Sequence, residues 1–298
     1  MAVVFLDPEP STGDGFDVAA QYQMVPSGGH RRMGLWVQAD ETEDVIIYPA
    51  DPNKIGLWGL YTIDGRPAVT RGAGYQVARN SAIRFFMRGR DPGPTALIVE
   101  TVSGKPRSFL LVSVKTQRAL TYQLYVLSDA VRKPNIVESG GEMKTIMADV
   151  ARLFIEQANV KLTQVGDIAN AAALLDLNAR DPLKRRIFLD DPTIFSAIAS
   201  AALAAPHAIA DLYIFRTWDI VIESKPDLVG LATGNCCFVE NFPPGNRATS
   251  LYAHEIGHNL GLFHDNDAQH IMFPNIGGLS FSMHDIETMN FGYPIGAI

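Results

Sequence analysis

The sequence has few cysteines, no long hydrophobic run and no excess of positive charge, and each absence excludes a class of protein. Only two of the 298 residues are cysteines, so a disulfide framework is excluded and the chain must fold on an apolar core. No run of about 18 apolar residues occurs, so the sequence predicts no membrane span. The formal net charge of −7 argues against a nucleic-acid partner, because such proteins present basic surfaces.

The first residues predict no Sec signal. Residues 1–7 contain no basic side chain, and their apolar stretch ends at Asp7, too early for the hydrophobic region of a signal peptide. We therefore expect synthesis in the cytoplasm without a Sec signal, with secretion by a signal-independent route as an open alternative.

The two cysteines, Cys236 and Cys237, are neighbours in the sequence. A disulfide between adjacent residues is strained, so two reduced and largely buried thiols are expected. A redox pair and an inhibitory thiolate remain as alternatives.

Apolar residues make up 47 % of the sequence, enough for a substantial core. The first 116 residues have the sequence pattern of a β domain. Short apolar stretches alternate with turn signals such as Asp51-Pro52-Asn53 and Asp64-Gly65, which indicates strands joined by tight turns. The predicted strands cover residues 45–48, 55–63, 82–87, 96–99 and 109–114. We therefore predict a small all-β sandwich over residues 1–116.

From residue 117 onward, strand and helix patterns alternate, which predicts an α+β domain with a helix-flanked sheet over residues 117–298. Apolar residues at helical spacing predict a helix over 142–158, and Asp191-Pro192 is typical of the start of another, reaching to about residue 204. Strands are predicted over residues 120–127, 160–165, 212–215, 228–232 and 236–239.

The residues best suited to chemistry lie in a predicted helix over 250–260. His254 and His258 are four positions apart, so both imidazoles lie on one face and can bind one metal ion. The adjacent Glu255 can accept a proton from a water molecule at the metal without binding the metal itself, which is the role of a general base.

Gly261 and His264 complete this pattern. Glycine at position 261 can end the helix in the left-handed conformation, so the reversed chain can bring His264 to the metal as a third ligand. Three histidines and one open position are typical of a catalytic site, so we expect one Zn²⁺ per chain. All five positions coincide by chance in only about one chain in 10⁵.

The segment HEIGHNLGLFH, residues 254–264, resembles the signature of the metzincin clan of zinc peptidases. The resemblance covers roughly residues 117–298 and implies a mixed twisted sheet with flanking helices. Met272, in the segment HIMFP, matches the methionine of the Met-turn beneath the metal. Residues 279–289 are similar to the C-terminal helix of the clan, with Ser282 or Ser280 as its cap. The resemblance also implies that residues 228–232 form an antiparallel edge strand, with Gly230, Leu231 and Ala232 binding substrate.

Within the clan, His264-Asp265 and the proline two residues after Met272 are closest to the reprolysins (adamalysins). In this comparison Asp265 would orient the Met-turn, and Pro274, Asn275 and Ile276 would wall the pocket for the residue after the scissile bond. Reprolysins are rich in disulfides and this chain is not. Position 274 also lacks the tyrosine of the astacins and serralysins, so stabilisation of the oxyanion would rest mainly on the metal.

The end of the predicted sandwich, residues 93–114, is similar to the last hairpin of bacterial immunoglobulin-like domains. Our hypothesis is that residues 1–116 form a targeting domain or a pro-like domain. In the second case Asp7, Asp14 or Asp17 would occupy the open position of the metal.

Taken together, these patterns predict a zinc-dependent endopeptidase that hydrolyses internal bonds of a protein or peptide substrate. A role as an exported bacterial effector or toxin would add a secretion machinery or an inhibitor as a partner. Two alternatives stay open: a binding or targeting protein with a secondary zinc site, and a zinc hydrolase that acts on a non-peptide substrate.

Overall fold

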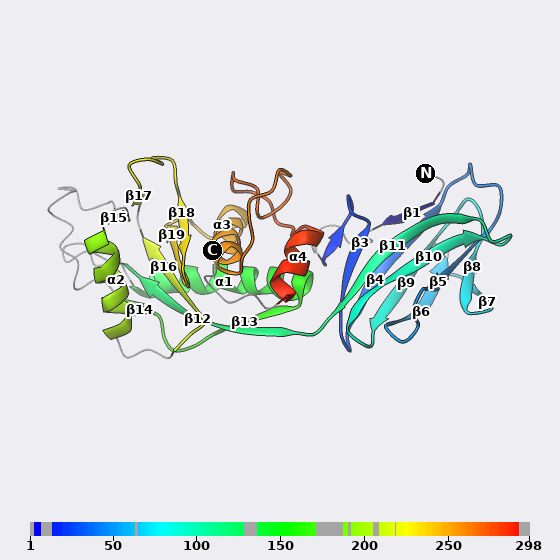
Figure 1. The fold of residues 1–298 in the computed structure, drawn as a ribbon, viewed down its shortest axis with the longest axis horizontal. Helices are drawn as coiled ribbons and strands as arrows, with labels where there is room; N and C mark the ends of the chain where they lie inside the picture. The colour runs from blue at the N-terminus through cyan, green and yellow to red at the C-terminus, as the bar shows by residue number, and fades with distance from the viewer. Residues whose placement is uncertain are drawn as a thin grey trace. The chain divides into compact units, whose positions relative to one another are not determined.

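The computed structural model describes residues 3–6, 14–62, 65–127, 136–170, 187–189, 192–204, 209–217 and 219–291. The chain divides into two compact units, each treated by itself (Figure 1). The first unit contains Met1–Arg118, Glu156–Asn159 and Phe281–Asn290; the second contains Ala119–Ile155, Val160–Ser280 and Phe291–Ile298.

Two sheets form the first unit. The four-stranded sheet has the order β1 (Val3–Leu6), β4 (His30–Val37), β9 (Ser81–Gly89), β6 (Ile55–Thr62). The seven-stranded sheet has the order β2 (Phe16–Asp17), β3 (Tyr22–Pro26), β11 (Pro106–Lys115), β10 (Gly93–Thr101), β5 (Val45–Pro49), β8 (Gly74–Val77), β7 (Val69–Arg71). Alternate side chains of both sheets form one apolar core, which includes Phe5, Leu35 and Phe85 from the first sheet and Ile47 and Val112 from the second.

Each of the five predicted strands of this unit coincides with an observed one, namely β5, β6, β9, β10 or β11. Strands such as β4 were not predicted: β4 (HRRMGLWV) begins with three polar residues, and its apolar segment 33–37 contains Gly34, which weakens a strand pattern. The pairs of this unit are antiparallel except β3 with β11, which is parallel. The assignment as an immunoglobulin-like domain stays a prediction.

The last helix, α4 (Met283–Asn290), belongs to the first unit. Ser282 caps it, because its hydroxyl accepts the N–H of Asp285 (3.2 Å) and its own N–H donates to the Asp285 carboxylate (3.0 Å). Tyr22 donates to the Glu287 carboxylate (2.8 Å), which also pairs with Lys115.

The three aspartates considered as blockers of a metal have different surroundings. Both carboxylate oxygens of Asp17 are engaged within the first unit, one by the N–H of Ala20 (3.0 Å) and one by the N–H of Met283 (2.9 Å). The Asp14 carbonyl accepts bonds from Gln23 and Arg31, and Asp7 lies outside the described residues.

A mixed sheet forms the centre of the second unit. Its order is β13 (Val160–Gln164), β12 (Arg118–Val126), β16 (Leu212–Thr217), β19 (Cys236–Glu240), β18 (Gly230–Thr233), and the short β14 (Ala169–Asn170) also pairs with β12. β12, β16 and β19 are parallel, whereas β18 at the edge is antiparallel to β19. Outside this sheet, β15 (Ile187–Phe188) pairs with β17 (Ile220–Val221).

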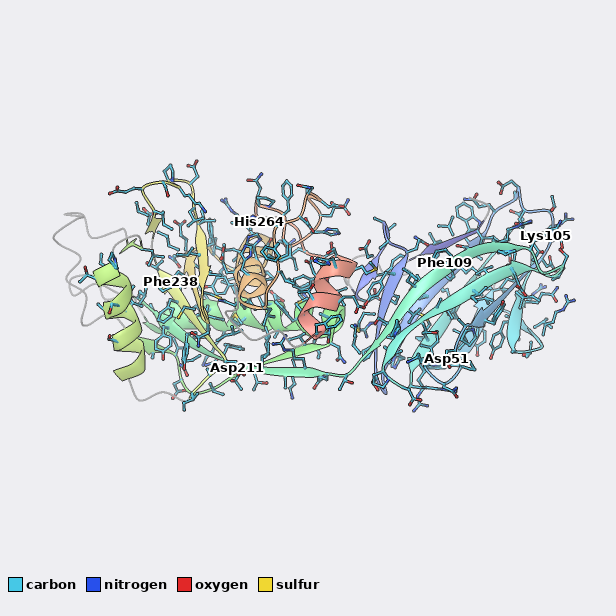
Figure 2. The ribbon with its side chains drawn as sticks, viewed as in Figure 1. Asp51, Lys105, Phe109, Asp211, Phe238 and His264 are labelled. Atoms are coloured by element: carbon cyan, nitrogen blue, oxygen red, sulfur yellow. The ribbon has the colours of Figure 1, made fainter. Side chains whose placement is uncertain are left out.

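Three helices accompany this sheet: α1 (Ile136–Ala158), α2 (Pro192–Ala204) and α3 (Asn246–Asn259). The predicted stripe of α1 is buried at Met143, Ile146, Met147, Val150 and Phe154, although the helix begins six residues before the predicted start at 142. Within the sheet, the rings of Tyr125, Phe215 and Phe238 stack across three neighbouring strands, with centroids 4.8 and 4.9 Å apart. Phe238 is labelled in Figure 2. The fold is α+β overall, as predicted, and none of the helices among the described residues is long and apolar enough to cross a membrane.

Candidate metal centre

Helix α3 carries two of the three predicted metal ligands, His254 and His258, one turn apart on one face. It begins at Asn246, four residues before the predicted start, and eleven of its fourteen residues are buried. This burial fixes the direction in which both imidazoles leave the helix.

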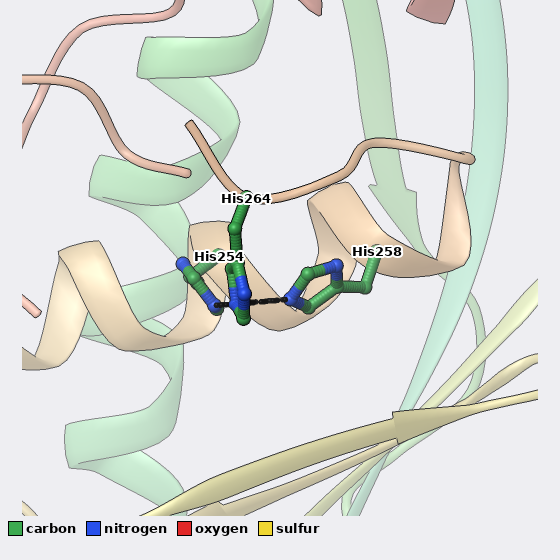
Figure 3. Close-up of side chains that lie close together, drawn as sticks. All are labelled: His254, His258 and His264. Carbon is green, nitrogen blue, oxygen red and sulfur yellow. Dashed lines mark hydrogen bonds between the residues drawn. The ribbon is translucent and has the colours of Figure 1, made fainter. Parts of the chain in front are cut away.

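The helix ends where the sequence places Gly261. Leu260 is the C-cap residue of α3. Gly261 follows it with a φ of 90°, in the left-handed region that glycine enters without steric cost. Gly261 donates its N–H to the carbonyl of His258 (3.0 Å), and Leu262 donates to the carbonyl of Gly257 (3.0 Å), which together form a Schellman motif. The reversed chain then brings His264 back over α3 (Figure 3).

The three histidines converge through their Nε2 atoms (Figure 3). The Nε2 atom of His258 lies 3.0 Å from that of His254 and 3.1 Å from that of His264, and the third separation is 3.2 Å. Three nitrogens bound at the usual zinc distance on a tetrahedron would be about 3.3 Å apart. Among the described residues, no other group of three or more His, Cys, Asp or Glu side chains is placed to hold a metal.

The other ring nitrogens show why these Nε2 atoms suit a cation. The Nδ1 atom of His254 lies 2.8 Å from the carbonyl of Ile271, and that of His258 lies 2.8 Å from the carbonyl of Leu262. Each Nδ1 therefore donates its proton, which leaves the lone pair on Nε2. Burial lowers the pKa of His254 to about 4 and also lowers that of His258, so both rings are neutral. Lone pairs that face one another at these distances repel, and a metal ion removes the repulsion.

Glu255 lies beside this triad with its side chain buried. Burial raises the pKa of its carboxyl to about 8. Among the described residues, none donates a hydrogen bond to this carboxylate. One oxygen lies directly against the backbone of Gly230, because a Cβ atom placed there would be 2.3 Å from Oε1 of Glu255. The edge strand therefore covers the carboxylate only because position 230 has no side chain.

A cleft of about 390 Å³ opens over the triad. Its lining includes the three histidines, Glu255 and the edge strand with Gly230, Leu231 and Ala232. Pro274 and Ile276 also line it, whereas Asn275 between them is exposed and lies outside the lining.

The cleft also contains residues that the sequence pattern did not single out, above all Lys225 and Asp227. They belong to the segment before the edge strand, and no spacing connects them to the histidines. Only the approach of that segment to α3 brings them to the cleft.

The segment after His264 folds back and packs against α3. The N–H of Asp265 donates to the carbonyl of Met272 (3.0 Å), and the Asp265 carboxylate lies 2.7 Å from Nδ1 of His270. Met272 is fully buried against α3, where a Cβ atom at Gly257 would lie 2.6 Å from its sulfur. Asp265 therefore connects the third histidine to the segment that holds Met272.

The two cysteines lie on β19, where successive side chains point to opposite faces of the sheet, and both are free thiols. Cys237 donates to the side-chain oxygen of Asn259, whose amide donates to the carbonyls of Gly234 (2.7 Å) and Cys236 (3.3 Å). Burial raises the pKa of Cys236 to about 11 and raises that of Cys237 as well, so both remain protonated. This arrangement supports the reduced thiols and argues against a redox pair or an inhibitory thiolate.

Comparison with known families agrees with this geometry. The family model of the matrixins matches residues 184–291, which include the triad and Met272. This match supports a metallopeptidase of the metzincin clan, and the matrixin family uses zinc. It does not bear on the resemblance to the reprolysins, which stays a prediction. No curated protein matches the sequence.

Three solved structures are similar to parts of this chain at low sequence identity. Domains 4 and 5 of the S-layer protein SbsC are 12 % identical over 30 % of this chain and 45 % of theirs, with a TM-score of 0.22. The copper nitrite reductase from Nitrosomonas europaea is 15 % identical over 31 % of this chain and 32 % of its own (TM-score 0.25). WR4, an MSP family member of C. elegans, is 11 % identical over 32 % of this chain and 90 % of its own (TM-score 0.21). The chain thus spans less than half of the first two proteins, and TM-scores this low carry no argument about fold.

Proposed function

We propose that the protein is a zinc-dependent endopeptidase in which His254, His258 and His264 hold the metal and Glu255 is the general base. The observation that carries the proposal is the convergence of three Nε2 atoms within 3.0 to 3.2 Å beside a buried carboxylate in an open cleft. The matrixin match supports the metallopeptidase class, and the role of Glu255 is the further step that we propose.

The chemistry divides between the metal and the chain. A zinc ion, when bound, would polarise the scissile carbonyl, acidify a water molecule and lower the pKa of the neighbouring Glu255. Glu255 accepts the proton of the attacking water and later delivers it to the leaving amine. Since no described side chain donates a hydrogen bond to this carboxylate, its oxygens are available for that proton. Burial keeps competing bulk water away from it.

The substrate is proposed to bind as an extended strand. Among the described residues, β18 is the edge strand of the sheet, and it lines the cleft, so a peptide can add to it through backbone hydrogen bonds. Gly230, Leu231 and Ala232 would provide those backbone groups, while Pro274 and Ile276 would contact the side chain that follows the scissile bond. A folded protein would have to present a flexible segment to this edge.

The proposed activity has a consequence for the cell that makes the protein. An endopeptidase with an open cleft would cleave proteins of its own cytosol, so we propose either secretion by a signal-independent route, as an effector or toxin, or control by an inhibitor. Detection of the intact protein in the medium of producing cells that have not lysed would support secretion.

Digestion of denatured casein by the full chain, with and without a chelator, tests the proposal. Cleavage that the chelator abolishes and added zinc restores is expected. A protein that binds zinc but cleaves no peptide would instead support a secondary zinc site or a hydrolase of non-peptide substrates. Hydrolysis of model esters or acetylated sugars would separate those two.

A further inference from the structure

A second cavity, of about 450 Å³, lies in the first unit, on the four-stranded sheet. It is at the end of the sheet where β4 begins, β9 ends and β6 begins. His30, Arg88 and Gly56 are paired in register across these three strands, so they form one row at the cavity. The volume is in the range of sites for small ligands, about 300–1,000 Å³.

The charge of this cavity is positive. Arg88 is exposed, and no described residue forms a hydrogen bond or an ion pair with its guanidinium. Arg90 also lines the cavity and donates to the carbonyl of Pro52 (2.8 Å). A Cβ atom at Gly56 would lie 3.0 Å from the Arg90 guanidinium, so the glycine makes room for it to lie along β6. None of the four strands contains an Asp or a Glu, although the whole chain has a net charge of −7.

One wall of the cavity is an exposed aromatic ring. Trp58 is 46 % exposed, and its indole stacks on Phe86 with centroids 4.6 Å apart. The His30 ring meets both edge-on, 6.0 Å from Trp58 and 5.8 Å from Phe86. These contacts hold the indole in one orientation, while its exposed part can receive a ligand with an apolar face.

We propose that this cavity binds an acidic saccharide, a sugar that carries a carboxylate or a sulfate. A pyranose ring presents a face of C–H groups that can stack on Trp58, and its anionic group can pair with the guanidinium groups of Arg88 and Arg90. The cavity contains no acidic side chain that would repel such a ligand. This site is independent of the proposed peptidase activity and would give the first unit a role in binding the enzyme to a glycan.

Single-stranded nucleic acid also combines rings with anions, but it fits the surface less well. Proteins that bind single-stranded nucleic acid follow its phosphate backbone with a continuous positive groove, because every nucleotide carries a phosphate. Here the next exposed arginine of β9 on the same face is Arg84, four residues or about 13 Å from Arg88. Residues 1–118 contain 13 Lys and Arg against 12 Asp and Glu, so this part of the chain has almost no net positive charge.

The test is calorimetric titration of the full chain with heparin and polygalacturonate oligosaccharides, with neutral dextran and oligo(dT) as competing probes. Binding of at least one acidic oligosaccharide is expected, with none to dextran. Removal of a charge-assisted hydrogen bond typically lowers affinity about ten- to a hundredfold, which we expect for Arg88→Ala. Trp58→Ala should lower it by about tenfold.

Two variants on the same sheet serve as matched controls. Trp36 is 45 % exposed on β4, and Arg84 is exposed on β9, but neither lines the cavity. Trp36→Ala and Arg84→Ala should therefore bind as the unchanged protein does. Equal losses in all four variants would overturn the local site, as would tighter binding of oligo(dT) or no binding of any acidic oligosaccharide. Because Arg88 is exposed and has no hydrogen-bond or ion-pair partner among the described residues, Arg88→Ala separates a binding defect from a folding defect.

Discussion

At the scale of single residues, backbone carbonyls hold two of the three histidines of the site in place. His254 and His258 donate to the carbonyls of Ile271 and Leu262, so their Nε2 atoms point at a common centre. We expect protein purified without added zinc to contain about one zinc ion per chain. Alanine at any of the three positions should lower that content sharply, as metal analysis would show. His284→Ala, an exposed histidine of α4, is the control; full zinc content in all three triad variants would refute the ligand set.

Glu255 is predicted to act on the reaction and not on metal binding. Glu255→Gln keeps the size and burial of the side chain, but an amide cannot accept the proton of water. We expect unchanged zinc content and a fall in kcat of about 10²–10⁴-fold. Peptidase assays and metal analysis on the same preparation measure both quantities. A variant as fast as the unchanged enzyme would assign the base to another residue.

Gly230 is predicted to position Glu255 through the absence of a side chain. The Cβ atom of Gly230→Ala would be 2.3 Å from Oε1 of Glu255 and 2.8 Å from Cδ1 of Leu251. The carboxylate ends a flexible side chain, so it should move while the strand stays in place. Displacement of a catalytic group by about 1 Å can cost about 10²-fold, so we expect kcat to fall with zinc content preserved.

The control for this prediction is Gly141→Ala in α1, where a Cβ atom would meet no atom within 4 Å. A stability measurement extends the test beyond activity. In denaturant unfolding, Gly230→Ala should cost less in a Glu255→Ala background, because the colliding carboxylate is gone. Additive effects on stability would show that the two residues do not contact each other.

At the scale of elements, the segment after Met272 is predicted to select the substrate. Gly277 donates its N–H to Ser250 of α3 (3.0 Å), which holds this segment beside the cleft. Pro274 and Ile276 line the cleft and carry no charge, so a charged substrate side chain would lose its hydration there without compensation. We expect cleavage before medium or large apolar residues, as mass spectrometry of a peptide-library digest would show.

A charge placed where this segment lines the cleft should change which residue is preferred after the scissile bond. Ile276→Glu is expected to favour cleavage before Lys or Arg, whereas Asn275→Glu adds the same charge outside the cleft and should change little. If the unchanged enzyme cleaved mainly before charged residues, Lys225 and Asp227, which also line the cleft, would be the groups that form the pocket.

At the scale of the whole molecule, the predicted boundary at residue 117 separates α4 from its partners. Asp17, Tyr22 and Lys115 bind Met283 and Glu287 of this helix, and all of them lie within the first unit. A chain that starts at residue 117 should therefore unfold at a lower temperature than the full chain.

The activity of the truncated chain tests the role of the first unit. If it targets the enzyme, casein cleavage per folded molecule stays unchanged; a large gain would instead show latency, and failure to fold would refute the boundary. Glu287→Gln in the full chain is the matched control, because it weakens the contacts of α4 with Tyr22 and Lys115 while all other residues stay.

Features that depend on local spacing could be predicted from the amino-acid sequence alone. Four positions between His254 and His258 place both rings on one helix face, and Gly261 can end the helix because its φ of 90° is open to glycine. Strands β5, β10 and β11 were predictable because their apolar runs are continuous.

Features that depend on contact between segments far apart in the sequence became visible only in the folded chain. The contact of Gly230 with Glu255, the place of α4 among the residues of the first unit, and the cavity beside Trp58 and Arg88 each join positions at least 25 residues apart. No periodicity records such contacts, because helix and strand patterns report which face of an element is buried, not which element covers it. The packing of sheets and helices against one another determines which distant residues come into contact.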